Sequence, residues 1–302
     1  MTRFEVTILG ANSAIPTANR FPTSQLLNVN ESYYLIDCGE GTQIQLRRNK
    51  LKFQRIETIF ISHLHGDHYF GLIGLLTTMH LLKREKPLKI IAPESLQEII
   101  SIQLRAGGTQ LGYSIDYVPL VFENGYEIFK DEKISVKVLK LSHRIDCAGF
   151  VFEELEKPRN LQKDNIDKYN LTFEEIKSLK NSIPIIRDKK ELLEQLLEEK
   201  EITRTYAYVT DTKALESIIP FIESVDLLYH ESTFLKNETK RAKATFHSTT
   251  HQAANIALKA KVKRLMLGHY STRYLDLELL LAEAREVFEN CILAIEGKTV
   301  KV

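Results

Sequence analysis

One feature limits the folds open to this chain more than any other. It is a short apolar run followed at once by three histidines and an aspartate. Residues 58–62 read Thr-Ile-Phe-Ile-Ser, a pattern typical of a strand buried on both faces. Four side chains able to bind a metal follow within six residues, around a glycine that permits a sharp turn: His63, His65, Asp67 and His68. Burying these groups unpaired would be costly, so the cluster predicts a metal site at the carboxyl end of a sheet strand.

Three later segments repeat this arrangement. The apolar runs 136–141, 206–210 and 264–268 lead to His143, Asp211 and His269, respectively. Any one of these residues alone could equally be an incidental polar residue. Because each follows the end of an apolar run, we expect all of them to converge with the first cluster along one edge of a sandwich.

Seven ligands are too many for one tetrahedral ion. Divided over two ions that share one carboxylate and one bridging water, they give each ion four protein contacts and a reactive position. The donors are all nitrogen and oxygen, whereas closed structural zinc sites favour cysteine, so the set indicates catalysis. We expect two divalent ions, Zn²⁺ in the first place and Mn²⁺ as the alternative, about 3.5–4 Å apart.

Four further motifs accompany the metal residues. They are Asp-Cys-Gly-Glu-Gly-Thr-Gln at 37–43, His-Glu-Ser-Thr-Phe at 230–234, His-Ser-Thr-Thr at 247–250 and His-Tyr-Ser-Thr-Arg-Tyr at 269–274. With these motifs the chain resembles the metallo-β-lactamase superfamily and, within it, the ribonuclease Z family, which trims the 3′ trailer from precursor tRNA. The resemblance covers nearly the whole chain. The metal residues are common to the superfamily, whereas the Glu231 and His247 motifs are particular to the tRNA-processing branch.

The resemblance implies an α/β fold, the four-layer αββα sandwich, and a role for each site residue. It places His63, His65 and His143 on one ion, Asp67, His68 and His269 on the other, and Asp211 between them. Asp67 would also orient and deprotonate the attacking water, and His247, held by Glu231, would protonate the leaving 3′ oxygen. The alternative for His247 is a residue at a helix N-terminus beside Ser248. Asp37 is expected to hold a ligand histidine rather than a metal.

Three basic residues are candidates for substrate binding. Arg273 lies in the 269–274 motif, and Lys243 belongs to a basic cluster that leads into His247. The family uses the loop at 10–21 to handle the tRNA end, and here only Pro16 and Arg20 follow the family pattern, which leaves recognition of the CCA end open. Charge clusters of this kind are commonly solvated faces, which is the alternative.

We predict one domain, 1–302, with an arm inserted at about 154–204. This segment has many charges and two helical stripes, Leu171, Phe173, Ile176 and Leu179, and then Leu192, Leu193, Leu196 and Leu197. The segment is either a helical insertion on the protein surface or the arm that binds the tRNA elbow in this family. The Gly-Pro tip of the family's arm is absent here. Elsewhere we expect helices at 69–84, 94–105, 215–223, 249–261 and 277–287, and strands at 88–92 and 291–302.

Composition supports these expectations without deciding the function. The net charge of +1 says little about nucleic-acid binding, which depends on local basic clusters. No apolar stretch is long enough to cross a membrane, and Cys38, Cys147 and Cys291 are typical of buried thiols in a reducing cytoplasm. The resemblance further implies precursor tRNA as substrate and a homodimer. The alternative function is a small-molecule phosphodiesterase or another hydrolase on the same metal core.

Overall fold

The computed structural model describes residues 3–156, 159–181, 183–187, 190–193, 195–198 and 202–302. The chain divides into two compact units. One comprises residues 1–153 and 204–302, and the other is the inserted segment 154–203. Each unit is described separately below.

The larger unit contains two seven-stranded sheets. The first has the order β16-β1-β2-β3-β4-β5-β6, with bounds Thr299–Lys301, Phe4–Gly10, Ser24–Val29, Ser32–Ile36, Ile56–Phe60, Leu88–Ala92 and Ile115–Pro119. The second has the order β15-β14-β13-β12-β9-β8-β7, with bounds Cys291–Leu293, Leu265–Gly268, Leu227–Glu231, Thr205–Val209, Cys147–Glu154, Ile134–Leu141 and Glu127–Lys130. Within the first sheet β3, β4, β5 and β6 are parallel, as are β12, β13, β14 and β15 within the second.

The inner strands of the first sheet are buried on both faces because successive side chains alternate between two apolar cores, whereas the edge strands β6 and β16 are partly exposed. In β3, Tyr34 and Ile36 enter the core between the sheets, whereas Tyr33 and Leu35 enter the core under the outer helices. This explains why such strands read as continuous apolar runs.

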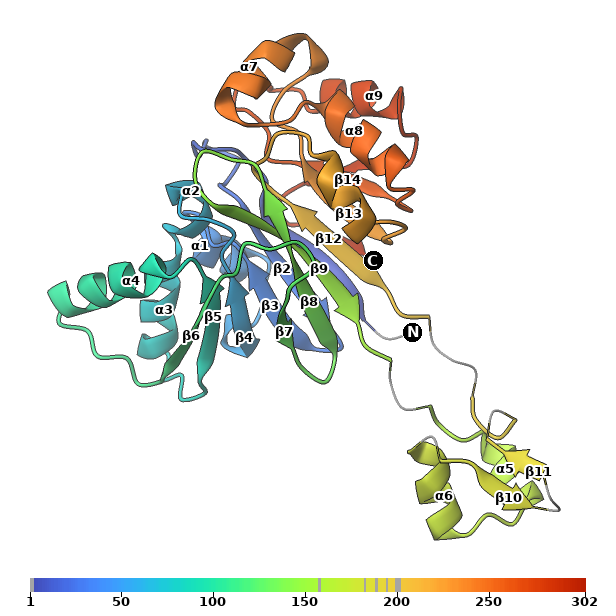
Figure 1. Cartoon of the computed structure of the whole chain (residues 1–302). Coiled ribbons are helices and arrows are strands. Elements are labelled where there is room, and N and C mark those ends of the chain that lie inside the picture. The colour runs from blue at the N-terminus through green and yellow to red at the C-terminus, as the bar shows by residue number, and fades with distance from the viewer. Residues whose placement is uncertain (1–2, 157–158, 182, 188–189, 194, 199–201) are drawn as a thin grey trace. The chain divides into compact units, whose positions relative to one another are not determined.

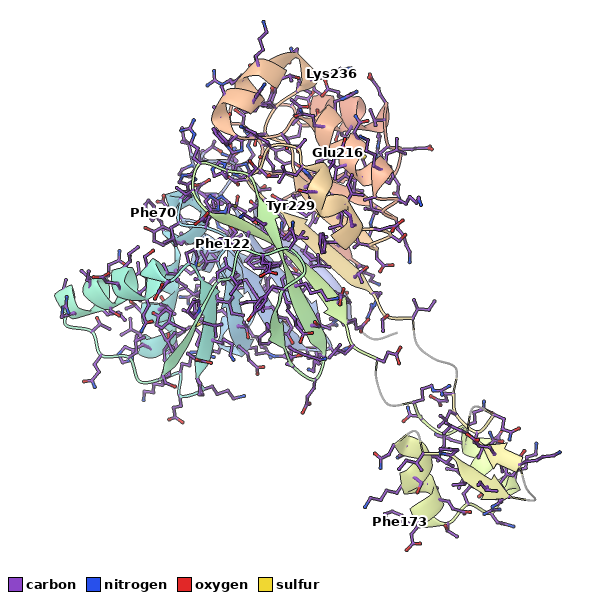
Figure 2. The ribbon with its side chains drawn as sticks, viewed as in Figure 1. Phe70, Phe122, Phe173, Glu216, Tyr229 and Lys236 are labelled. Carbon is purple, nitrogen blue, oxygen red and sulfur yellow. The ribbon has the colours of Figure 1, made fainter. Side chains whose placement is uncertain are left out.

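Helices cover the outer face of each sheet. Against the first lie α1 (Thr42–Arg48), α3 (Leu72–Leu81) and α4 (Ser95–Ala106), and against the second lie α8 (Thr250–Lys259) and α9 (Glu278–Arg285) (Figure 1). In α3 the buried residues Leu72, Leu75, Leu76 and Met79 follow the helical period. The predicted αββα sandwich is confirmed, and side chains fill the space between its layers (Figure 2).

Three expectations about individual elements of the larger unit need correction. The helix expected at 69–84 is shorter and follows a separate turn, α2 (Gly66–Tyr69). The one expected at 215–223 is a 3-10 helix, η2 (Glu216–Phe221), which contains Pro220, a residue that cannot donate the α-helical hydrogen bond. The closing strand is two short strands, β15 and β16, which belong to different sheets.

The smaller unit has its own apolar core. It contains α5 (Lys163–Lys168), α6 (Phe173–Lys180) and a hairpin of β10 (Ile185–Arg187) and β11 (Lys190–Leu192). Of the first predicted stripe, Phe173, Ile176 and Leu179 lie in α6, whereas Leu171 precedes the helix and Phe173 points to solvent. The helix begins with a Thr172–Glu175 capping box. The second stripe was expected to form a helix, which is wrong for the described residues between 190 and 198. Leu192, Leu196 and Leu197 instead enter the small core from a strand end and a turn.

Candidate metal centre

The predicted ligands lie after the carboxyl ends of four strands. His63 and His65 follow β4, Asp67 and His68 lie in the short helix α2 that comes next, and His143, Asp211 and His269 follow β8, β12 and β14, respectively. Two of these strands, β12 and β14, are separated by β13 in the second sheet, while β4 belongs to the first. The site therefore assembles only when both sheets pack together, as the sequence analysis predicted.

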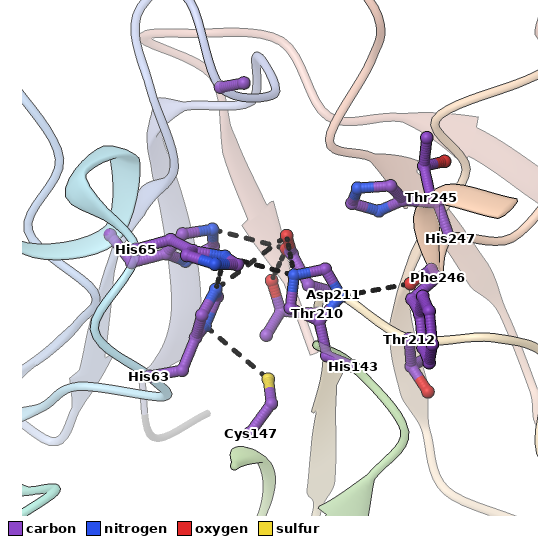
Figure 3. A network of polar contacts seen from close by, with 12 residues as sticks. His63, His65, His143, Cys147, Thr210, Asp211, Thr212, Thr245, Phe246 and His247 are labelled. Carbon is purple, nitrogen blue, oxygen red and sulfur yellow. Dashed lines mark hydrogen bonds and ion pairs between the residues drawn. The ribbon is translucent and has the colours of Figure 1, made fainter. Parts of the chain in front are cut away.

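One group contains His63, His65, His143 and Asp211, whose candidate ligand atoms all lie within 4.8 Å of one another (Figure 3). His65 Nδ1 is 3.1 Å from Nε2 of both His63 and His143. Asp211 Oδ2 is 3.9 Å from His63 Nε2 and 3.6 Å from His143 Nε2. Three nitrogens and one oxygen therefore converge on one point.

The second group contains Asp67, His68, Asp211 and His269, again within 4.8 Å. Here Asp211 presents its other oxygen: Oδ1 is 3.2 Å from His68 Nε2 and 3.1 Å from His269 Nε2. Asp67 Oδ2 lies 3.4 Å and 3.6 Å from the same two nitrogens. One Asp211 oxygen therefore faces each group, an arrangement that suits a carboxylate shared by two ions.

The other ring nitrogen of four histidines is held by the surrounding protein. His68 Nδ1 donates to Asp37 Oδ2 at 2.7 Å, and His143 Nδ1 donates to the carbonyl of Phe246 at 3.1 Å. His63 Nδ1 lies 3.0 Å from Ser62 Oγ, and His269 Nδ1 lies 3.0 Å from Thr233 Oγ1. Each contact fixes the ring and turns Nε2 towards its group, the usual support of a metal-binding imidazole.

The electrostatics differ between the ligand histidines. Burial alone would lower the pKa of His68, but the carboxylates of Asp67, Asp211 and Asp37 outweigh burial and hold that pKa well above its ordinary value. Burial, reinforced by neighbouring imidazoles, holds the pKa of His63 well below its ordinary value and lowers the pKa of His143. The neutral imidazole is the form that binds a metal. Nε2 of His68 and Nε2 of His269 are buried and make no hydrogen bond within the described part of the chain. One divalent cation in the second group would satisfy both nitrogens, so the residues of that group fit a metal ion.

A second ionisable pair adjoins both groups. His247 Nδ1 donates to Glu231 Oε1 at 2.8 Å. The centre of the His247 ring is 5.2 Å from that of His143 and 5.3 Å from that of His269, which are members of different groups. Both Glu231 oxygens are already hydrogen-bonded, to His247, Thr212 and Thr233, so this carboxylate supports its neighbours rather than offering a free metal ligand.

Three residues beside the site have a strained backbone, as do several turn residues elsewhere in the described chain. Asp37, Phe246 and His269 have φ values of 54°, 62° and 58°, in the left-handed region that side chains rarely adopt. In each case the unusual turn accompanies a contact described above: the Asp37 carboxylate, the Phe246 carbonyl and the His269 ring. The surrounding sheets hold these conformations, which local propensity alone does not favour.

A cavity of about 400 Å³ opens over the two groups. Among the proposed substrate-binding residues Arg273 lines it, whereas Arg20 and Lys243 are not among its lining residues. From the loop at 10–21, Ser13 and Ala14 line the cavity instead, and the Ala14 amide donates to Asp67 Oδ2 at 2.9 Å. Two further lining arginines, Arg144 and Arg241, were not named as site residues from the sequence. The sequence held a signal for each: Arg144 directly follows His143, and Arg241 belongs to the basic cluster that leads into His247.

Fold and site together define a metal-binding protein of the metallo-β-lactamase fold. Two solved structures share this fold: human tRNase Z, short form (TM-score 0.71, 27% identity, 98% of each chain covered), and YhfI from Bacillus subtilis (TM-score 0.70, 20% identity, 99% and 100% covered). The family model described as Anti-Pycsar protein Apyc1 matches residues 4–166.

Full-length relatives define the family more narrowly. Ribonuclease Z of Bacteroides thetaiotaomicron is 41% identical over 100% of this chain and 96% of its own length. Ribonuclease Z of Cytophaga hutchinsonii is 42% identical over 99% of this chain and 96% of its own length. The chain belongs to the ribonuclease Z family.

Proposed function

We propose that this chain is a metal-dependent endoribonuclease that cleaves the 3′ trailer from precursor tRNA. The observation that carries the proposal is the Glu231–His247 pair beside two ligand groups that share Asp211. Phosphodiester hydrolysis needs an activated water, charge stabilisation on the phosphoryl oxygens and an acid for the alkoxide leaving group. The full-length likeness to ribonuclease Z supports precursor tRNA as the substrate.

The proposal assigns the metal ligands and the acid–base groups as follows. His63, His65 and His143 would hold one ion, Asp67, His68 and His269 the other, and Asp211 would bridge them. When bound, two such ions lower the pKa of a water and neutralise phosphoryl charge. Asp67 orients the attacking water and accepts its proton, and its own position is held by the Ala14 amide. His247, protonated and held by Glu231, gives its proton to the leaving 3′ oxygen.

We propose Zn²⁺ for both ions, because imidazole and carboxylate donors suit it, with Mn²⁺ as the alternative for the same donor set. Elemental analysis of protein purified without added metal distinguishes the two. We also propose a homodimer, which sedimentation analysis tests. The three cysteines are buried and free, which supports a reducing cytoplasm as the compartment. Among the described helices, none has the length and apolar character needed to span a membrane.

The inserted unit is proposed to bind the tRNA away from the cleavage site. It supplies none of the seven candidate ligands, yet it has its own core and exposes Phe173 at 81% and Ile186 at 76%. Maintaining a separately packed element is consistent with a binding role that a compact substrate would not need.

The alternative is a small-molecule phosphodiesterase on the same metal core. A cavity of about 400 Å³ is within the range of small-ligand sites, which supports this alternative. The decisive experiment is incubation of purified protein with precursor tRNA that carries or lacks CCA, followed by mapping of the products. We expect one cut at the 3′ side of the acceptor stem. Turnover of small phosphodiesters with intact precursor tRNA would favour the alternative.

A further inference from the structure

The carboxylate of Asp37 accepts four hydrogen bonds at the base of the metal centre. Oδ1 accepts from the Ser62 amide at 2.8 Å. Oδ2 accepts from Ser62 Oγ at 2.9 Å, from His68 Nδ1 at 2.7 Å and from the Tyr208 hydroxyl at 2.6 Å. Asp37 therefore fixes the ring of His68, and whatever fixes Asp37 also fixes His68.

Tyr208 differs from the other donors in its origin. Ser62 and His68 follow β4 of the first sheet, whereas Tyr208 lies in β12 of the second. Within the described part of the chain, Tyr208 is the only residue of the second sheet that donates to Asp37. Burial, and then the adjacent Asp37 carboxylate, keep the pKa of Tyr208 well above its ordinary value, so its hydroxyl remains a donor.

The same strand carries the bridging carboxylate. Asp211 follows Tyr208 by three residues, and its Oδ1 lies 3.2 Å from His68 Nε2. The Tyr208 hydroxyl therefore links two parts of the metal centre. One is β12, the strand that leads to Asp211, and the other is the Asp37 carboxylate, which orients His68. The separation of these two ligands depends on the packing of the sheets, and this hydrogen bond ties the sheets together at that point.

We propose that Tyr208 is a positioning residue of the metal centre. Through its hydrogen bond to Asp37 it fixes the position of the His68 ring relative to the Asp211 carboxylate, so that both can bind the same ion. The inference rests on the proposed two-ion site, but not on precursor tRNA as the substrate. It assigns a function to a side chain that is otherwise indistinguishable from its core neighbours, because Tyr206, Tyr208 and Tyr229 are all fully buried.

Tyr229 provides a matched control. Its ring stacks on that of Tyr208 with centres 5.1 Å apart and planes at 14°, and it is equally buried. Its hydroxyl, however, has no hydrogen-bond partner among the described residues. Tyr208→Phe and Tyr229→Phe therefore remove the same atom from neighbouring rings in the same core, and only the first removes a contact to the metal centre.

The experiment measures metal binding directly. Metal-free wild type and both variants are titrated with Zn²⁺ by calorimetry, and with Co²⁺ by visible absorption, which reports the geometry of the ligands. We expect Tyr208→Phe to weaken binding of one of the two ions about tenfold, the lower end of the usual cost of losing such a support. Its Co²⁺ spectrum should change, while Tyr229→Phe should match the wild type in both measurements.

A double-mutant cycle tests whether Tyr208 acts through Asp37. Asp37→Asn should itself weaken binding, and adding Tyr208→Phe to it should cost little more. Fully additive losses, or two ions bound by Tyr208→Phe with wild-type affinity and spectrum, would overturn the inference. Circular dichroism of the metal-free proteins verifies that the fold is kept. If the wild type itself binds no ions, the proposed function fails instead, so the two failures remain distinguishable.

Discussion

Glu231 accepts a hydrogen bond from His247 at 2.8 Å with one carboxylate oxygen, and with the other it accepts from Thr233 at 2.7 Å. Thr233 Oγ1 in turn lies 3.0 Å from Nδ1 of His269. One buried carboxylate thus supports both the proposed acid and a proposed ligand of the metal centre. The position of the acid relative to the ions is therefore fixed through a single residue.

This relationship predicts the pH dependence of hydrolysis. Burial alone would lower the pKa of His247, but the Glu231 carboxylate outweighs burial and raises it to about 9. A proton donor acts only below its pKa, so kcat/KM should fall as the pH rises through about 9. Glu231→Gln removes the charge that raises this pKa, so the alkaline limb should move to lower pH. Superimposable pH profiles for wild type and Glu231→Gln would show that His247 is not the titrating acid.

Loss of the shared carboxylate should abolish hydrolysis. Asp211 contributes an oxygen to each ligand group, so Asp211→Ala affects both ions at once. We expect activity on a small phosphodiester to fall at least a hundredfold with the fold retained. Asp116→Ala is the control, because Asp116 is exposed and pairs with Lys89 on the surface. Near-normal turnover by Asp211→Ala would contradict the two-ion mechanism, and His65→Ala provides an independent loss of one ligand.

Metal content and stability should change together. We expect elemental analysis to find two divalent ions per chain. Because the ions would bind the folded chain preferentially, removal by a chelator should lower the thermal unfolding midpoint, and Zn²⁺ should restore it. Without the ions, the buried Nε2 atoms of His68 and His269 make no hydrogen bond among the described residues and have only carboxylate oxygens nearby, which is the physical reason for this loss. At most one tightly bound ion in active protein would refute the seven-ligand assignment.

Removal of the arm should separate two activities. Replacing residues 160–200 by a short linker removes no candidate ligand, so hydrolysis of bis-p-nitrophenyl phosphate should survive. Cleavage of precursor tRNA should fall steeply, mainly through KM, because uniform binding is lost. Equal retention of both activities would show that the arm is dispensable. Loss of both, with altered circular dichroism, would show only damage to the fold.

A single substitution tests the arm without deleting it. Leu179 is 1% exposed within the small core, so Leu179→Ala should destabilise that unit by about 2–5 kcal/mol. Phe173→Ala is the matched control on the same helix, because Phe173 is 81% exposed. Only Leu179→Ala should make the arm sensitive to limited proteolysis while turnover of the small substrate is unchanged.

Arg273 should contribute more to RNA binding than Lys243. Arg273 lines the cavity over the ligand groups, and its guanidinium lies 5.1 Å from the centre of the Phe234 ring. Arg273→Ala should raise KM for precursor tRNA. It should also reduce the slope of the logarithm of the binding constant against the logarithm of the salt concentration by about one unit. Lys243→Ala, which alters no lining residue, should change KM by less. Equal effects of the two variants would show that only general charge matters.

Much of the site could be predicted because its signal is local. His63, His65, Asp67 and His68 lie within six residues, and a strand end is a position that apolar periodicity reveals. The arm's second leucine stripe shows the limit of such reasoning. The spacing of Leu192, Leu196 and Leu197 fits a helix, but the small core accepts them from a strand and a turn. Spacing alone does not say which neighbours will bury a side chain.

By itself, the sequence determined which groups could bind metal and that they follow the ends of apolar runs. Only the tertiary structure decided that Asp211 turns one oxygen to each group, that Arg273 rather than Arg20 lines the cavity, and that Tyr208 reaches Asp37. Local sequence specifies a residue's chemistry and its strand. Which side chains meet across two packed sheets depends on register and packing between segments distant in the chain, and these are properties of the whole fold.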